Sequence, residues 1–127
     1  MADTIDNTFE TIEHNAYSGH KSSGEYVIRN EGEWNTLWNQ VTAGRIPQPE
    51  APSVDFETQM ILGVFLGERR SGGYSIEISR IRETENSLEV YVTEKTPQFG
   101  MMSASALSQP YHLIKTGLTD KEVKYIR

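Results

Sequence analysis

The sequence contains no cysteine. This absence excludes disulfide bridges, thiolate metal sites and cysteine nucleophiles. Long apolar runs are missing as well, since no stretch reaches the roughly 18 residues that a membrane-spanning helix needs. The opening segment, MADTIDNTFE, is acidic and polar and has neither the basic nor the apolar part of a secretory signal. No membrane span and no signal peptide are therefore expected, and the compartment is left unassigned.

Positive charge is in the minority. The chain has 12 lysines and arginines against 18 aspartates and glutamates, which gives a net charge of −6. A protein that binds a phosphate backbone needs a basic face. No nucleic-acid partner is therefore expected.

Catalytic and metal-binding patterns are equally scarce. His14, His20 and His112 show no HxH or HxxxH spacing, so they offer no local zinc site. The motifs GxSxG, SxxK and HExxH are absent. His112 lies in a predicted strand, where a structural histidine is the favoured interpretation. We expect a protein that is not an enzyme and that uses no cofactor or metal.

A chain of 127 residues fits one domain. Residues 1–7 are short of apolar anchors and are predicted to form a disordered tail. The single domain is expected to span residues 8–127.

Most of this domain is predicted to be β-structure. Residues 58–66 carry apolar side chains in both phases of the alternation, which indicates a strand buried on both faces. Gly63 within it indicates a close backbone approach or a bulge. Residues 73–82 alternate until Ile81, which indicates a bulge near Arg80. The other predicted strands are 8–17 and 26–29, which suggest a hairpin, then 88–93, which pairs with 73–82, and finally 111–115 and 122–126.

One helix is predicted over residues 31–43. Asn30 is a suitable N-cap, and Glu33 stands where a capping-box acid belongs. Gly44 supplies a left-handed stop. Two tryptophans on one face are compatible with a ligand platform, but an anchor onto a sheet is the favoured interpretation. The apolar face consists of Trp34, Leu37, Trp38 and Val41.

These elements predict the fold class. We expect an α+β, mainly β domain, with an antiparallel sheet or sandwich of about six to seven strands and the helix 31–43 packed on it.

The loop Gly67–Gly73 is the first candidate for function. Its glycines allow a tight turn, and Arg69 and Arg70 can bind carboxylates or phosphates. The loop matches neither a P-loop nor a dinucleotide-binding fingerprint. A dedicated anion site remains an alternative to solvated loop charges.

The second candidate is the segment 97–109, which carries no charged side chain. Met101 and Met102 stand side by side near Phe99, and methionine is common on surfaces that adapt to partners. The segment either folds back over the sheet or forms an exposed patch that binds a partner.

Several short motifs follow one another between residues 24 and 116. They are Tyr26-Val27-Ile28, Glu33-Trp34 with Leu37-Trp38, Pro52, Val54-Asp55-Phe56, Met60–Gly67, Ser71–Ile76, Thr96-Pro97 and Gln109–His112. In this order they resemble the C-terminal domain of the PrcB protease-complex subunit family. The resemblance implies a noncatalytic bacterial domain, in some proteins exported, whose namesake associates with a secreted subtilisin-like protease and stabilises it. Family members often carry a cysteine in the loop equivalent to 98–105, where this chain has Met101-Met102.

The expected function is that of a protein-interaction domain with a protein partner, for which the resemblance implies a subtilisin-like protease. Two alternatives remain open: a small-ligand or peptide-binding domain with a cleft between helix and sheet, and a peptidase inhibitor. The predicted partner-binding residues are Arg69, Arg70, Gly72, Gly73, Phe99, Met101 and Met102.

Overall fold

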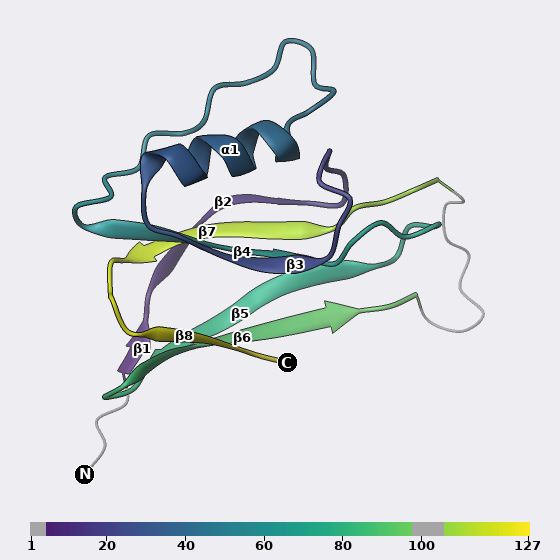
Figure 1. The fold of residues 1–127 in the computed structure, drawn as a ribbon. Helices are drawn as coiled ribbons and strands as arrows, with labels where there is room; N and C mark the ends of the chain where they lie inside the picture. Colours follow the sequence, from purple (N-terminus) through teal and green to yellow (C-terminus); the bar gives the residue numbers. More distant parts are fainter. Residues whose placement is uncertain (1–4, 98–105) are drawn as a thin grey trace.

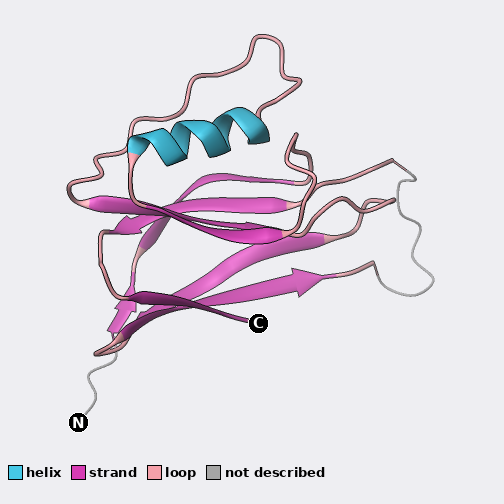
Figure 2. Cartoon of the chain, viewed as in Figure 1, coloured by secondary structure: helices cyan, strands magenta, loops and turns pink. Residues whose placement is uncertain are grey.

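Two four-stranded sheets face each other, and a helix lies over the outer face of one of them (Figures 1 and 2). This computed structural model describes residues 5–97 and 106–127. Within them no helix is long and apolar enough to cross a membrane. The elements are β1 (Ile5–Asn7), β2 (Phe9–Asn15), β3 (Gly24–Ile28), α1 (Glu31–Val41), β4 (Gln59–Phe65), β5 (Ser75–Glu83), β6 (Ser87–Lys95), β7 (Tyr111–Gly117) and β8 (Glu122–Ile126).

The first sheet has the strand order β1-β5-β6-β8, and the second has the order β2-β7-β4-β3. Neighbouring strands are antiparallel except β6 and β8, which run parallel. The chain passes from the first sheet to the second at Thr8, between β1 and β2. The mainly β, α+β class predicted from the sequence is confirmed.

Strand β4 contributes to two apolar layers. Met60, Leu62 and Val64 face the other sheet, whereas Ile61 and Phe65 face the helix. All five are buried, as the two-phase apolar pattern predicts. The layer between the sheets also contains Leu66, Ile76, Ile78, Ile81, Leu88, Val90, Val92 and Ile114.

Gly63 lies where side chains of β4 and β7 pack tightly over the sheet. A Cβ added there would lie 2.8 Å from Leu113 Cδ2 and 3.4 Å from a Phe65 ring carbon. Real Cβ atoms do not come that close to other heavy atoms, so only glycine fits without movement of its neighbours. The nearest atoms belong to side chains and the strand pairing has no register shift at Gly63, so tight side-chain packing takes the place of the predicted close backbone approach or bulge.

The helix begins as the sequence predicts. The Asn30 side chain accepts a hydrogen bond from the Glu33 backbone N–H (2.8 Å) and donates one to the Glu33 carboxylate (2.9 Å), which forms a capping box. The helix ends at Val41, two residues before the predicted end, because Thr42 caps it and Gly44 then takes a φ of 93°.

The tryptophan face of the helix belongs to the core. Trp34 and Trp38 are only 1% and 4% exposed. Their indole N–H groups donate to the carbonyls of Pro52 (3.0 Å) and Pro49 (2.9 Å), so the proline-rich segment lies against the same face. The anchor interpretation is confirmed.

The predicted hairpin between residues 8–17 and 26–29 is wrong. Strands β2 and β3 stand at opposite edges of the second sheet, with β7 and β4 between them. The central strands β4 and β7 carry apolar side chains toward both layers. Burying them between β2 and β3 outweighs the direct pairing of β2 with β3 that their short connection would favour.

The N-terminal prediction is also wrong for part of the tail. Residues 5–7 form β1 and pair with Ile81–Glu83 of β5. Two side-chain contacts accompany this pairing: Asp6 accepts from Arg80 (2.8 Å), and Asn7 donates to Glu83 (2.8 Å). Polar contacts of this kind leave no apolar pattern in the sequence.

The predicted pairing of 73–82 with 88–93 is confirmed by β5 and β6, and the register shift between Ile78 and Arg80 is the predicted bulge. The strand count is eight among the described residues, one or two more than predicted. The extra strand is the short β1.

Replacing Gly63 with alanine tests the tight packing between β4 and β7. We expect Gly63→Ala to lower the free energy of unfolding by about 1–3 kcal/mol, because the new methyl group overpacks a buried contact. Urea denaturation measures the change. Gly117→Ala is the control, since a Cβ at Gly117 meets no atom within 4 Å. Equal stabilities of the two variants would contradict the argument.

Candidate functional site

Loops from distant parts of the chain gather at one end of the sandwich, on the right in Figure 1. They are the β2–β3 connection, the turn after α1, the β4–β5 loop and the approach to β7. Backbone hydrogen bonds tie them to one another. These run from Arg69 to Ser108 in both directions (2.8 and 2.9 Å), from Gln109 to Ala16 (2.7 Å), from Glu68 to Lys21 (3.0 Å) and from Gly19 to Val41 (2.9 Å).

The Gly67–Gly73 loop brings four of the predicted partner-binding residues together. The Arg69 guanidinium lies 5.6 Å from the centre of the Tyr74 ring, a cation–π distance, while Arg70 is exposed to solvent. Gly72 is half-buried, and Gly73 is exposed with a φ of 89°. Arg70 is therefore the arginine of this loop that is available to a partner.

The other three predicted residues, Phe99, Met101 and Met102, lie outside the described residues. The last part of the 97–109 segment is described, and it runs beside the first loop. There the Ser108 hydroxyl donates to the Ser71 carbonyl (2.8 Å), and Leu107 is 53% exposed. The end of this segment therefore shares the loop end with Arg69 and Arg70.

Two exposed apolar residues at this end were not predicted from the sequence as binding residues. Tyr17 is 56% exposed and Ile46 is 97% exposed. Tyr17 lines a hollow of about 260 Å³ together with Arg45 and Gln109, and Ile46 directly follows Arg45. From the sequence, Tyr17 was assigned to the end of a strand. The only sign that it lies at a turn is that Ser18 and Gly19 follow it.

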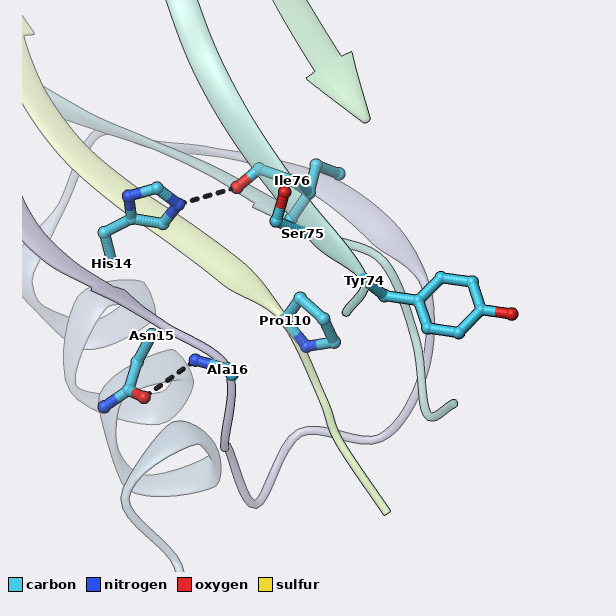
Figure 3. A pocket seen from close by; sticks show the side chains of 7 residues that line it. All are labelled: His14, Asn15, Ala16, Tyr74, Ser75, Ile76 and Pro110. Atoms are coloured by element: carbon cyan, nitrogen blue, oxygen red, sulfur yellow. Dashed lines mark hydrogen bonds between the residues drawn. The ribbon is translucent and has the colours of Figure 1, made fainter. Parts of the chain in front are cut away.

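A second hollow opens beside the loop end, between β2 and β5 (Figure 3). Strand β1 covers only the last residues of β5, so no described strand stands beside the edge from Ser75 to Arg80. His14 crosses this gap and donates from Nε2 to the Ile76 carbonyl (2.9 Å). The hollow has a volume of about 210 Å³ and is lined by His14, Asn15, Ala16, Tyr74, Ser75, Ile76 and Pro110.

A second histidine, His112, binds a backbone group on the same edge of β5. His14 and His112 stand opposite each other in the β2–β7 register, and their rings stack with centroids 4.4 Å apart. The Ile78 backbone N–H donates to His112 Nδ1 (2.9 Å), so the ring proton is on Nε2 and donates to the Thr11 hydroxyl (2.8 Å). Two histidines thus occupy positions on the edge of β5 that a neighbouring strand would otherwise fill.

The central part of the chain matches a known protein family. A family model described as PrcB C-terminal matches residues 60–117. The match confirms the resemblance to this family. Searches of curated proteins and of solved structures found no match.

The matched segment, residues 60–117, contains β5, β6, β7 and all of β4 except Gln59, and with them the central pair of the second sheet. The Gly67–Gly73 loop, the segment 97–109 and His112 all fall inside it. The helix, His14 and Tyr17 come from the preceding part of the chain. The loop end is therefore built jointly by the matched segment and by residues that precede it.

A partly buried polar cluster fixes the turn after the helix to the matched segment. The Glu13 carboxylate accepts hydrogen bonds from Arg45 (2.8 Å) and from the Tyr111 hydroxyl, and Arg45 also donates to Tyr111 (3.0 Å). Burial alone would raise the pKa of Glu13, but the hydrogen bonds from Arg45 and Tyr111 bring it below its ordinary value. The three groups satisfy one another, and their contacts hold Ile46 at the loop end.

The described residues contain no group of three or more His, Asp or Glu side chains placed to hold a metal ion. His112, which would have to serve as a catalytic base, uses both ring nitrogens in bonds to β2 and β5. The structural interpretation of His112 is confirmed.

Acid should weaken the fold through His112. Burial, with a smaller contribution from the neighbouring His14, lowers the pKa of His112 from 6.5 to about 4. Between these values the unfolded chain binds the proton and the folded chain does not, so stability falls as pH drops from 6.5 toward 4. We expect a loss of about 3 kcal/mol from this residue. Urea unfolding at several pH values measures it.

His112→Gln is the companion variant, since glutamine keeps hydrogen-bonding groups without titrating. Its free energy of unfolding should depend less on pH over this interval. Parallel pH dependences in both proteins would show that His112 is not the group responsible.

Proposed function

We propose that this chain is a noncatalytic protein-interaction domain that binds and stabilises a subtilisin-like protease through its loop end. The observation that carries the proposal is the gathering of exposed Tyr17, Ile46 and Leu107 with Arg70 on loops that are hydrogen-bonded to one another. Tyrosine and arginine are enriched among the residues that dominate binding energy at protein interfaces.

The rigidity of the loop end supports this role. The connections between loops use backbone groups, and the Glu13–Arg45–Tyr111 cluster holds the segment that precedes Ile46. A surface that is already ordered loses little conformational entropy when a partner binds. Apolar side chains held in this way make efficient anchors.

Charge gives the expected character of the partner surface. Arg70 is exposed at the loop end of a chain whose net charge is −6. An acidic patch on the partner would be attracted to Arg70, while the rest of the chain would repel it, which favours one orientation of docking. Phe99, Met101 and Met102 remain proposed as further anchors.

A noncatalytic role is supported by the hydrogen bonds that the polar side chains make within the fold. His112 bonds both a backbone amide and a hydroxyl, and Glu13, Arg45 and Tyr111 bond one another. These four groups are therefore engaged in holding strands and loops together. The family match points the same way, since the resemblance is to an accessory domain.

A second candidate function is peptide or small-ligand binding between helix and sheet. A groove along α1 favours it, lined by Tyr26 and Ile28 on one side and by Leu37 and Gln40 on the other. Neither tryptophan lines this groove, so their fluorescence is not expected to report on it.

The loop-end proposal predicts an effect on protease lifetime. The full chain should lengthen the half-life of the subtilisin-like protease encoded nearest to its gene, without lowering the initial rate of peptide hydrolysis. The double variant Arg70→Glu, Leu107→Ser should lose at least tenfold in affinity for the protease, because it removes an apolar anchor and reverses a charge. Autolysis assays and calorimetric titration give the two readouts.

The matched control is Leu118→Ser, Lys124→Glu, which makes the same kinds of change away from the loop end; Leu118 is 41% exposed. It should bind like the unmodified chain. Stoichiometric loss of protease activity would identify an inhibitor instead. No effect of the chain on either half-life or activity would overturn the proposal.

A further inference from the structure

Two adjacent hollows along one flank of the helix are together called the groove. Its wider part, of about 420 Å³, lies between β3 and α1 and is lined by Tyr26, Ile28, Gly32, Thr36, Leu37 and Gln40. Its second part, of about 320 Å³, lies near the end of the helix and is lined by Gly19, His20, Lys21, Ser22, Tyr26 and Gln40. Tyr26 and Gln40 line both parts, so the two are adjacent.

The groove follows from the position of β3 at the edge of its sheet. The helix packs on Ile61 and Phe65 of β4 and on Leu113 of β7, which are central strands. Only Ile28 and Tyr26 of β3 reach this layer, and no described strand pairs with the outer edge of β3. The flank of the helix above β3 is therefore open.

Gly32 keeps the entrance of the groove free of a side chain. A Cβ at this position would meet only the Asn30 side-chain oxygen, at the ordinary distance of 3.5 Å. Packing therefore does not require glycine here, although glycine in a helix is less stable than alanine by about 1 kcal/mol. An open groove accounts for a residue that the fold alone does not need.

The two parts of the groove differ in chemistry. The wider part has an apolar floor made by the Tyr26 ring, Ile28 and Leu37, which suits an aliphatic or aromatic side chain. The second part is polar and carries the Lys21 ammonium, which forms no ion pair with any residue from 5 to 97 or from 106 to 127. A group with an apolar and an anionic end complements this arrangement.

His20 supplies an independent sign of a ligand. The side chain is only 8% exposed and lines the polar part of the groove. Its Nε2 shares a hydrogen bond with the Tyr26 hydroxyl (2.6 Å), but its buried Nδ1 has no hydrogen-bond partner in the described structure. Buried polar atoms without partners are rare in native proteins. In one of the two tautomers the Tyr26 hydroxyl donates to Nε2, and Nδ1 then carries the proton as a donor.

We propose that this groove binds the free carboxyl end of an extended peptide. The last side chain of the peptide, an apolar one, enters the space over Tyr26, Ile28 and Leu37. The terminal carboxylate lies in the polar part, where Lys21 offers a positive charge and Ser22 and His20 offer hydrogen-bond donors.

Charge also sets the direction of the peptide. Glu33 lines the wider part of the groove at the opposite end from Lys21. A carboxylate at that end would be repelled, whereas at the Lys21 end it is attracted. The peptide therefore approaches the polar part with its C-terminus, and basic residues upstream are favoured near Glu33.

The inference deepens the proposed interaction function, on which it rests, but it uses a different surface from Arg70 and Leu107. The probes are fluorescein-labelled hexapeptides, Gly-Ser-Lys-Gly-Ser-X, with X as leucine, isoleucine, valine or phenylalanine. Each is prepared as the free acid and as the C-terminal amide. Fluorescence polarisation against the full chain measures binding.

At least one free-acid peptide should bind with a micromolar Kd, and its amide should bind at least tenfold more weakly, because the charge-assisted contacts are lost. Lys21→Glu should cause a similar loss. Gly32→Leu should also abolish binding, because its side chain fills the entrance, while its Tm stays at or above that of the unmodified chain.

Two control variants keep the test specific. Gly32→Ala adds only a methyl group and should raise Tm while peptide binding persists. Lys124→Glu changes the same charge on the other sheet and should bind normally.

The proposal is overturned if no free-acid peptide binds at 1 mM or if acid and amide bind equally. It is also overturned if octanoate displaces the peptide at equal or lower concentration, which would identify a small amphiphile as the ligand. The protease half-life assay with Gly32→Leu separates the two proposals. If the unmodified chain lengthens the protease half-life but binds no peptide, the groove proposal fails and the loop-end proposal stands.

Discussion

The rest of the structure depends on the burial of β4 on both of its faces. One face of this strand meets the opposite sheet, and the other meets the helix, so a single strand joins two apolar layers. On the helix side, Gly63 of β4 makes room for the Leu113 side chain of β7, because a Cβ at this position would lie 2.8 Å from Leu113 Cδ2. The helix, the proline-rich segment above it and the loop end all take their positions from this central pair of strands.

The features that could be predicted from the sequence are those that depend on neighbouring residues. The helix was predictable because Asn30 and Glu33 form a local cap and four apolar residues share one face. The two-sided burial of β4 and the bulge near Arg80 were predictable for the same reason, since the pattern of each strand records its own burial. The glycines and arginines of the Gly67–Gly73 loop likewise indicated an exposed turn.

What could not be predicted depends on contacts between distant residues. The partners of β2 and β3 are chosen by central strands that lie far along the chain, and the parallel placement of β8 beside β6 has no local signal. The stacking of His14 on His112 could not be predicted, because no local pattern indicates that these two distant residues are neighbours. The groove was anticipated only as a cleft between helix and sheet, because the position of the helix above the central strands depends on packing rather than on local pattern.

The incomplete pairing at the sheet edges has a consequence for the behaviour of the protein in concentrated solution. His14 and His112 occupy backbone groups of β5, and the Tyr125 hydroxyl donates to the Tyr26 carbonyl at the edge of β3. Exposed strand edges are the usual starting points for association of identical chains into fibrils. These three side chains take up hydrogen-bonding positions that a strand from another copy would use. They therefore oppose the edge-to-edge association of identical chains.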